Sequence, residues 1–129
     1  MARVLVVEDG PELRALLEFR LRQSGHQVVS AGSGEEALGV LAEKEAPDVA
    51  VLDVLLPGMT GLELHSRLRQ DPNFARVPVV FLSGRIQPAD IAAGLALGAT
   101  YLTKPVVVSS LTKAIDQALQ ANRIDPGTW

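Results

Sequence analysis

Asp48-Val-Ala-Val-Leu52, followed at once by Asp53, is the stretch that decides the fold class. Its apolar residues follow one another without alternating with polar ones, a pattern typical of a strand buried on both faces. Arg3-Val-Leu-Val-Val7 and Val77-Pro-Val-Val-Phe-Leu82 show the same pattern. Three strands of this kind predict a parallel sheet with helices packed on both of its faces.

Outside these stretches, short apolar runs alternate with longer segments of helical periodicity. Leu13, Leu16, Leu17 and Leu21 recur at helical spacing and form one apolar stripe. The predicted strands are Val4–Val7, Val28–Ala31, Val49–Leu52, Val77–Leu82 and Tyr101–Thr103. The predicted helices are Pro11–Gln23, Glu35–Glu45, Leu62–Gln70, Pro88–Leu97 and Ser109–Gln120. This strict alternation predicts an open, doubly wound α/β sheet.

Local signals mark the ends of several predicted helices. Ser33-Gly-Glu-Glu36 and Thr60-Gly-Leu-Glu63 match the capping box, in which a hydroxyl satisfies a free N–H group of the first turn. Pro11 suits the first position of a helix, and Gly25 suits the position just after a helix ends. These signals support the predicted helix boundaries.

Composition limits the class of protein. The chain has 129 residues, of which 47% are hydrophobic and 21% charged, which suits one folded domain. We expect that domain over residues 1–121 and a tail or linker stub over 122–129, which carry a Pro-Gly breaker. The net charge of −3 gives no field that would attract nucleic acid or anionic lipid. With no cysteine, signal peptide or membrane span, a cytoplasmic location is the simplest expectation.

Polar residues directly follow four of the predicted strands: Glu8, Asp9, Asp53, Ser83 and Lys104. In an open parallel sheet, ligands bind beyond the carboxyl ends of the strands, so we expect these side chains to converge. Carboxylates that meet at one place repel each other unless they share a cation, and oxygen ligands favour Mg²⁺ with phosphate as a further ligand. A carboxylate there can attack phosphorus, while an ammonium and a hydroxyl stabilise the phosphoryl oxygens.

Each residue of this set also has a structural explanation when taken alone. Asp9 before Gly10-Pro11 could cap a helix. Glu8 and Lys104 could be solvated surface charges, and Ser83-Gly84 could form an ordinary turn. Asp53 is the hardest to explain in this way, because an unpaired charge at the end of an apolar strand is costly.

The sequence closely resembles the receiver domain of two-component response regulators. Four segments carry the resemblance: Glu8-Asp9, Asp53-Val-Leu-Leu-Pro-Gly-Met-Thr-Gly61, Ser83-Gly84 and Tyr101-Leu-Thr-Lys-Pro105. It extends over about residues 3–120. The resemblance implies a flavodoxin-like (βα)5 three-layer sandwich with parallel strand order 2-1-3-4-5. It also implies a phosphorylation-dependent signalling switch of a phosphorelay rather than a turnover enzyme.

The resemblance also implies a role for each site residue. Asp53 is expected to accept a phosphoryl group from a sensor histidine kinase or a phosphotransfer protein. The implied Mg²⁺ ligands are Glu8, Asp9, Asp53 and the backbone carbonyl of Leu55. Ser83 and Lys104 are expected to contact the phosphoryl group, and Tyr101 matches the switch aromatic. Pro105 resembles the family's cis-proline turn.

Two further expectations concern regulation. We expect a partner or homodimer surface on the 90–120 face, where the apolar segment Ile91–Gly98 neighbours the last strand and helix. Leu55 and Arg85 lie two positions beyond Asp53 and Ser83 and should flank an attacking water. Because apolar Leu55 cannot orient that water, we expect slow hydrolysis of the phosphorylated form.

The chain departs from the family pattern near its last strand. Gly98-Ala-Thr-Tyr101 is one residue shorter than the usual Gly-Ala-x-x-Tyr, and the acidic residues of winged-helix regulators are absent there. Their charge-paired dimer is therefore not expected. Val106 replaces the usual Phe within a run of three valines, which predicts Ser109 or Ser110 as the cap of the last helix.

Four other functions are less consistent with the sequence. A flavin mononucleotide module would need a hydroxyl-rich phosphate loop where Glu8-Asp9 stands. An aspartate-dependent phosphatase usually has a second aspartate at the position of Leu55. A pseudo-receiver that only binds partners would not need the complete set of phosphorylation residues. Direct nucleic-acid binding is not expected, because no helix-turn-helix and no arginine stripe are present.

Overall fold

The computed structural model describes residues 2–84, 92 and 100–123, and it confirms the alternating pattern of strands and helices. The elements are β1 Arg3–Val7, α1 Pro11–Gln23, β2 Gln27–Ala31, α2 Gly34–Glu43, β3 Val49–Asp53, α3 Gly61–Gln70, β4 Val79–Ser83, β5 Thr100–Thr103 and α5 Val108–Arg123. Their bounds differ from the predicted ones by at most three residues. For example, β4 begins after Pro78, which cannot donate to a strand ladder.

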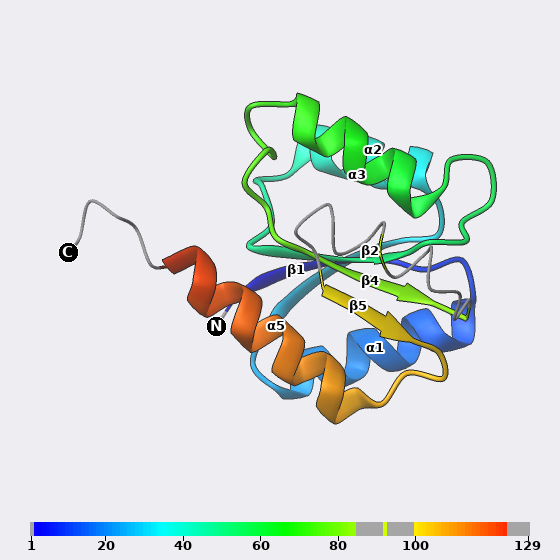
Figure 1. Cartoon of the computed structure of the whole chain (residues 1–129), viewed down its shortest axis with the longest axis vertical. Helices are drawn as coiled ribbons and strands as arrows, with labels where there is room; N and C mark the ends of the chain where they lie inside the picture. The colour runs from blue at the N-terminus through cyan, green and yellow to red at the C-terminus, as the bar shows by residue number, and fades with distance from the viewer. Residues whose placement is uncertain (1, 85–91, 93–99, 124–129) are drawn as a thin grey trace.

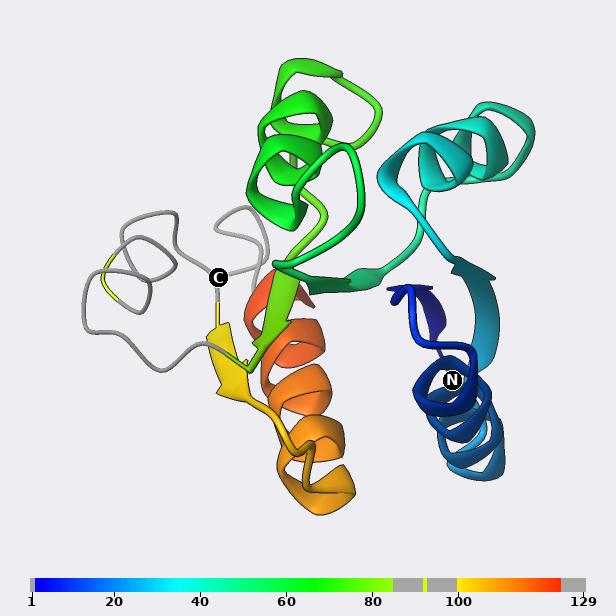
Figure 2. The same cartoon turned by 90° about the vertical axis from the view of Figure 1, so that its right-hand side faces the viewer.

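The strands form one parallel sheet in the order β2-β1-β3-β4-β5, as the resemblance implied (Figure 1). Figure 2 shows three layers, with α2 and α3 on one face of the sheet and α1 and α5 on the other. All five residues of β3 and all five of β4 are buried, which confirms that their unbroken apolar runs belong to strands covered on both faces.

Two apolar cores fill the space between these layers. On the α2/α3 face, Leu5, Leu52 and Phe81 pack with Leu64 and Leu68. On the α1/α5 face, side chains of the same strands pack against the two helices: Val4, Val6, Val51, Leu17, Leu21, Leu111 and Ile115. Alternate strand residues therefore serve opposite cores, and the shared edge at the carboxyl ends is left to polar side chains.

The helix ends follow the sequence signals in most places. Ser33 and Thr60 accept hydrogen bonds from the N–H groups of Glu36 and Glu63, each at 3.1 Å. Helix α1 begins at Pro11, and Gly25, just beyond its end, has a φ of +91°. The expected cap at Ser109 or Ser110 is wrong, because α5 begins at Val108 and both serines lie in its first turn. The first turn instead closes through a 3.1 Å bond from the Leu111 N–H to the Val107 carbonyl.

Several sequence predictions fall on residues outside the described ranges. They are the helix over Pro88–Leu97 apart from Ala92, the position of Arg85, the shortened stretch before Thr100, and residues 124–129 of the expected tail. Helix α5 itself continues to Arg123. Within residues 2–84, 92 and 100–123, no helix has the length and apolar character needed to cross a membrane.

Candidate functional site

Asp53 ends the central strand β3 and points both carboxylate oxygens at fixed partners. Its side chain is buried, Oδ1 accepts from the backbone N–H of Leu55 at 3.1 Å, and Oδ2 lies 2.9 Å from Nζ of Lys104. The turn after the strand is tight: Gly58 has a φ of +72°, and the Gly61 N–H donates to the Val54 carbonyl at 2.9 Å. The start of α3 therefore closes directly over the end of β3.

Two more carboxylates reach the same place from the end of β1. Glu8 is buried, and its Oε2 accepts from the Gly10 N–H at 2.8 Å. Asp9 is exposed. One carboxylate oxygen from each of Glu8, Asp9 and Asp53 lies within 4.8 Å of the other two. The predicted convergence of acidic residues from two distant segments is therefore present in the structure.

Lys104 brings a positive charge to this acidic cluster from the end of β5. Its Nζ lies 2.7 Å from Oε1 of Glu8 and 2.9 Å from Oδ2 of Asp53. Its backbone N–H donates to the Ser83 carbonyl at 2.7 Å, and the following peptide bond to Pro105 is cis, as the resemblance implied. Lys104 thus bridges the ends of β1 and β3 while it is tied to the end of β4.

The electrostatics of the cluster follow from burial and from this bridge. Burial raises the pKa of Glu8, and the neighbouring Asp53 charge adds to this, although Lys104 and the Gly10 N–H oppose it. Burial alone would lower the pKa of Lys104, but the bonds to the two carboxylates outweigh it, so that its pKa is raised. The ammonium therefore stays protonated between its two acidic partners at neutral pH.

The donor set fits a hard divalent cation. Three carboxylates and one ammonium leave about two negative charges uncompensated when all four groups are ionised. Oxygen ligands at an open edge, with one carboxylate exposed, suit an ion such as Mg²⁺ that keeps several waters. Glu8, Asp9 and Asp53 could hold such an ion. The role of the Leu55 carbonyl stays a prediction.

The two remaining predicted site residues, Ser83 and Tyr101, lie on neighbouring strands. Ser83 is fully buried at the end of β4, one strand from Asp53. Tyr101 pairs with Phe81 in the β4–β5 register, and their rings are tilted with centroids 6.4 Å apart. Tyr101 is partly buried against the α2/α3 core. The structure thus places a hydroxyl at the end of β4, next to β3, and a tyrosine ring on β5, the following strand. The switch role of Tyr101 stays a prediction.

Two residues with a bearing on the site were not found by sequence reasoning. Arg14 of α1 donates from Nη1 to the backbone carbonyl of Glu8 at 2.8 Å. His65 of α3 is buried against Phe81, with ring centroids 5.5 Å apart, and its Nε2 has no hydrogen-bond partner among the described residues. Helical spacing could have placed His65 in the core, since it directly follows Leu64 and lies three residues before Leu68. No spacing signal identifies the acceptor of Arg14.

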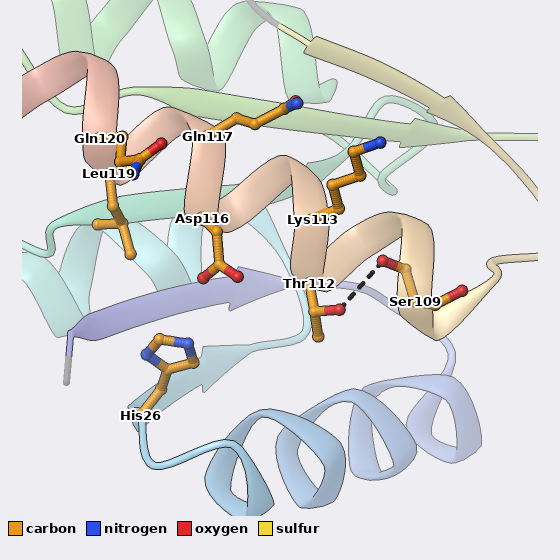
Figure 3. A pocket seen from close by; sticks show the side chains of 8 residues that line it. All are labelled: His26, Ser109, Thr112, Lys113, Asp116, Gln117, Leu119 and Gln120. Atoms are coloured by element: carbon orange, nitrogen blue, oxygen red, sulfur yellow. Dashed lines mark hydrogen bonds between the residues drawn. The ribbon is translucent and has the colours of Figure 1, made fainter.

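A polar pocket of about 560 Å³ lies away from this cluster, between α5 and the turn before β2. Figure 3 shows Asp116 of α5 directed toward His26 across it, while the Thr112 hydroxyl donates to the Ser109 carbonyl at 3.1 Å. The lining includes none of the predicted site residues, so the carboxylate cluster remains the candidate site.

Comparison with known proteins agrees with this geometry. The profile of the response regulator receiver domain matches residues 4–116. Protein PilH of Pseudomonas aeruginosa is 37% identical over 120 residues, which are 92% of this chain and 98% of PilH. The alkaline phosphatase synthesis transcriptional regulatory protein PhoP of Bacillus subtilis is also 37% identical over 123 residues. This chain spans only 50% of the length of PhoP.

Solved structures show the same fold. The chemotaxis protein CheY4 of Vibrio cholerae superposes with a TM-score of 0.84 at 32% identity, over 92% of this chain and 99% of that one. A putative response regulator from Chloroflexus aurantiacus gives a TM-score of 0.85 at 35% identity, over 92% and 98% of the two chains. The match along nearly the whole sequence, together with the shared fold, shows that this chain belongs to the response regulator receiver domain family.

Proposed function

We propose that this chain is a phosphorylation-dependent switch in which Asp53 accepts a phosphoryl group with the help of Mg²⁺. The observation that carries the proposal is the convergence of Glu8, Asp9 and Asp53 within 4.8 Å, with Lys104 bridging two of them. A buried carboxylate at a strand end, fixed by one N–H and one ammonium, is oriented for attack on phosphorus.

The proposed transfer makes one bond and breaks one bond. A carboxylate oxygen of Asp53 bonds to phosphorus, while the bond from phosphorus to the donor nitrogen of a phosphohistidine breaks, and that nitrogen keeps the electron pair. Bound at Glu8, Asp9 and Asp53, Mg²⁺ would neutralise charge on the phosphoryl oxygens. The product is an aspartyl phosphate, so the chain acts as an acceptor and not as a turnover enzyme.

Lys104 and Ser83 are proposed to hold the transferred group. Because Lys104 has a second partner in Glu8, it can turn toward phosphoryl oxygens without leaving a buried carboxylate unpaired. Ser83, on the strand beside Asp53, supplies a hydroxyl at the same edge. Movement of Ser83 toward the phosphoryl group is proposed to change the packing of Tyr101 on β5. That change would carry the signal to a partner or homodimer surface on the 90–120 face.

The phosphoryl donor is proposed to be a histidine kinase or a phosphotransfer protein. Exposed apolar side chains support a protein donor, because they lie on segments that border the carboxylate cluster. Leu16 and Phe19 are 44% and 58% exposed on α1, the helix that follows Asp9. Val107 is 60% exposed in the loop that follows Lys104. Apolar groups around a polar centre are a common composition for a transient protein interface.

Acetyl phosphate tests the acceptor without a partner protein. With Mg²⁺, intact mass should show one added phosphoryl group, and Asp53→Asn should abolish it. Asp116→Asn is the matched control, since Asp116 is an exposed aspartate on α5, and it should be labelled like the wild type. Undiminished labelling of Asp53→Asn, or labelling unaffected by EDTA, contradicts the proposal.

Beryllofluoride, which mimics a bound phosphoryl group, tests the switch. Amide chemical shifts in two-dimensional NMR should change at Asp53, Ser83 and Lys104 and also at Tyr101 and along α5. Changes that stop at the first three residues would leave phosphorylation in place but would remove the 90–120 face as the output surface.

A further inference from the structure

Arg14 lies at the point where β1 and β2 separate. The last ladder bond between them runs from the Glu8 N–H to the Ala31 carbonyl at 3.1 Å. Beyond it the Gly32 N–H turns to Oε2 of Glu36 at 3.0 Å. The Glu8 carbonyl accepts from Nη1 of Arg14 at 2.8 Å. A side chain of α1 thus satisfies the main-chain carbonyl that lies one residue before Asp9.

The bond holds the segment that carries two of the three carboxylates. Residues 8–10 are fixed by the Gly10 N–H bond to Oε2 of Glu8, by the Arg14 N–H bond to the Gly10 carbonyl at 2.9 Å, and by the guanidinium on the Glu8 carbonyl. Two of these three bonds come from Arg14. The guanidinium also lies next to Gly32, because a Cβ atom added to Gly32 would lie 2.9 Å from Nη1 of Arg14.

We propose that Arg14 is a positioning residue that sets the main chain at Glu8 and Asp9 so that their carboxylates are ready to hold a divalent cation. This inference rests on the proposed function, because the cation is part of it. Groups behind the direct ligands of a metal commonly orient those ligands and tune its affinity. Here the orienting bond ends on a main-chain oxygen, so it acts on both carboxylates through the backbone.

The direction in which Mg²⁺ affinity changes when Arg14 is removed distinguishes a positioning role from a simple effect of charge. Arg14 is a cation near an acidic site, so its charge alone weakens the binding of Mg²⁺, and its removal would tighten binding. Positioning predicts the opposite, because a loose Glu8–Asp9 segment must be ordered when the ion binds. A purely structural role predicts lower stability of the fold with unchanged affinity.

Two variants disturb the contact in different ways. Arg14→Met removes the donor and the charge but keeps an unbranched side chain. Gly32→Ala keeps Arg14 and its charge but displaces the guanidinium, which is the far end of a flexible side chain. Gly32 has no positive φ, so alanine fits its backbone. Gly39→Ala is the matched control, since an added Cβ there meets no atom within 4 Å.

The experiment is a Mg²⁺ titration of the full chain, followed by the backbone amide signals of residues 8–10 in NMR, with urea unfolding measured on each variant. We expect dissociation constants for Arg14→Met and Gly32→Ala about ten-fold weaker than for wild type. Gly39→Ala should match wild type, and Arg14→Lys, which keeps charge and donor, should fall between.

The outcomes are distinguishable. Equal or tighter binding by Arg14→Met, in a variant that unfolds like the wild type, overturns the positioning role. Weaker binding by Arg14→Met with unchanged binding by Gly32→Ala, once NMR shows the guanidinium displaced, overturns it as well. Failure of the wild type to bind Mg²⁺ would instead contradict the proposed function itself.

Discussion

Gly61, the first residue of α3, meets the end of β3 so closely that a Cβ atom added to it would lie 2.3 Å from the backbone oxygen of Asp53. It would also lie 2.9 Å from the carbonyl carbon of Asp53 and from Cα of Val54. Main chain, unlike the end of a long side chain, cannot move aside cheaply. The absence of a side chain at Gly61 therefore lets α3 begin directly over the end of β3.

Gly61→Ala should destabilise the protein by about 3 kcal/mol, the upper part of the range for overpacking, because α3 must shift away from β3. Labelling by acetyl phosphate should fall as Asp53 moves. Urea unfolding and intact mass measure the two effects. Gly39→Ala makes the same substitution on α2 in open space and should stabilise the protein by roughly 0.5–1 kcal/mol. Equal effects of the two substitutions would contradict the close contact.

Lys104→Met should destabilise the metal-free protein by about 2 kcal/mol. It leaves Glu8 and Asp53 as neighbouring buried carboxylates without their shared ammonium, and the loss is below that for a fully buried pair because 26% of the Lys104 side chain is exposed. Mg²⁺ should restore part of the loss, because it supplies positive charge to the same carboxylates.

Urea unfolding with and without Mg²⁺ measures this, and Lys113→Met on α5 is the control. Lys113 is exposed, so its loss should change stability by less than about 0.5 kcal/mol in both conditions. The pKa of Lys104 is raised above 10.5, so from neutral pH up to 10.5 its ion pairs contribute fully, and they are lost as the pH rises further. A Lys104→Met variant as stable as the wild type at pH 7.5 would contradict this account.

The fold could be predicted because its signals are local. Buried parallel strands are apolar on both faces, so β1, β3 and β4 are visible as unbroken runs, and hydroxyl caps fix the starts of α2 and α3. The site followed from the fold, since strand ends that share an edge must bring Glu8, Asp53 and Lys104 together. The start of α5 was missed because Val107, an apolar residue, takes the place of a hydroxyl cap.

Arg14 and His65 could not be predicted because their partners depend on packing. The acceptor of Arg14 is a main-chain oxygen, which every residue has, so the sequence does not single out Glu8. The periodicity of α3 indicates that position 65 is buried, but it does not reveal that the imidazole Nε2 has no hydrogen-bond partner among the described residues. Such contacts are decided by the three-dimensional arrangement of elements.

His65 should make stability fall as the medium becomes acidic. Burial lowers its pKa below 6.5, and the charge of Arg69 adds to this. Because the pKa of His65 is lower in the folded protein, the unfolded chain binds the proton more readily. Protonation of His65 therefore leaves the free energy of unfolding unchanged above pH 6.5 and lowers it as the pH falls below 6.5. His65→Leu should be more stable by about 1 kcal/mol at pH 7.5, since a buried unpaired polar group is removed. The difference in the free energy of unfolding between this variant and the wild type should be larger at pH 5.5.

Urea unfolding at both pH values tests this, with His65→Gln as the control that keeps a polar group but cannot titrate. The raised pKa of Glu8 has the opposite effect, since its protonation favours the fold as the pH falls toward 4.5. Glu8 is present in all three proteins, so it cancels in their differences. An advantage of His65→Leu that is the same at pH 7.5 and pH 5.5 argues against titration of His65.

Leu55→Asn should shorten the lifetime of the phosphorylated protein. Leu55 is 47% exposed, and its N–H donates to Oδ1 of Asp53. Under the proposed function we expect its side chain to flank the path of water to phosphorus. An apolar side chain cannot orient that water, whereas an amide contributes a hydrogen bond of about 1 kcal/mol, or roughly five-fold in rate. Decay of the added mass after removal of acetyl phosphate measures the rate. Leu16→Asn is the matched control, because Leu16 is 44% exposed on α1 and should leave the rate unchanged. If both variants decay at the wild-type rate, Leu55 does not control access of water to the phosphoryl group.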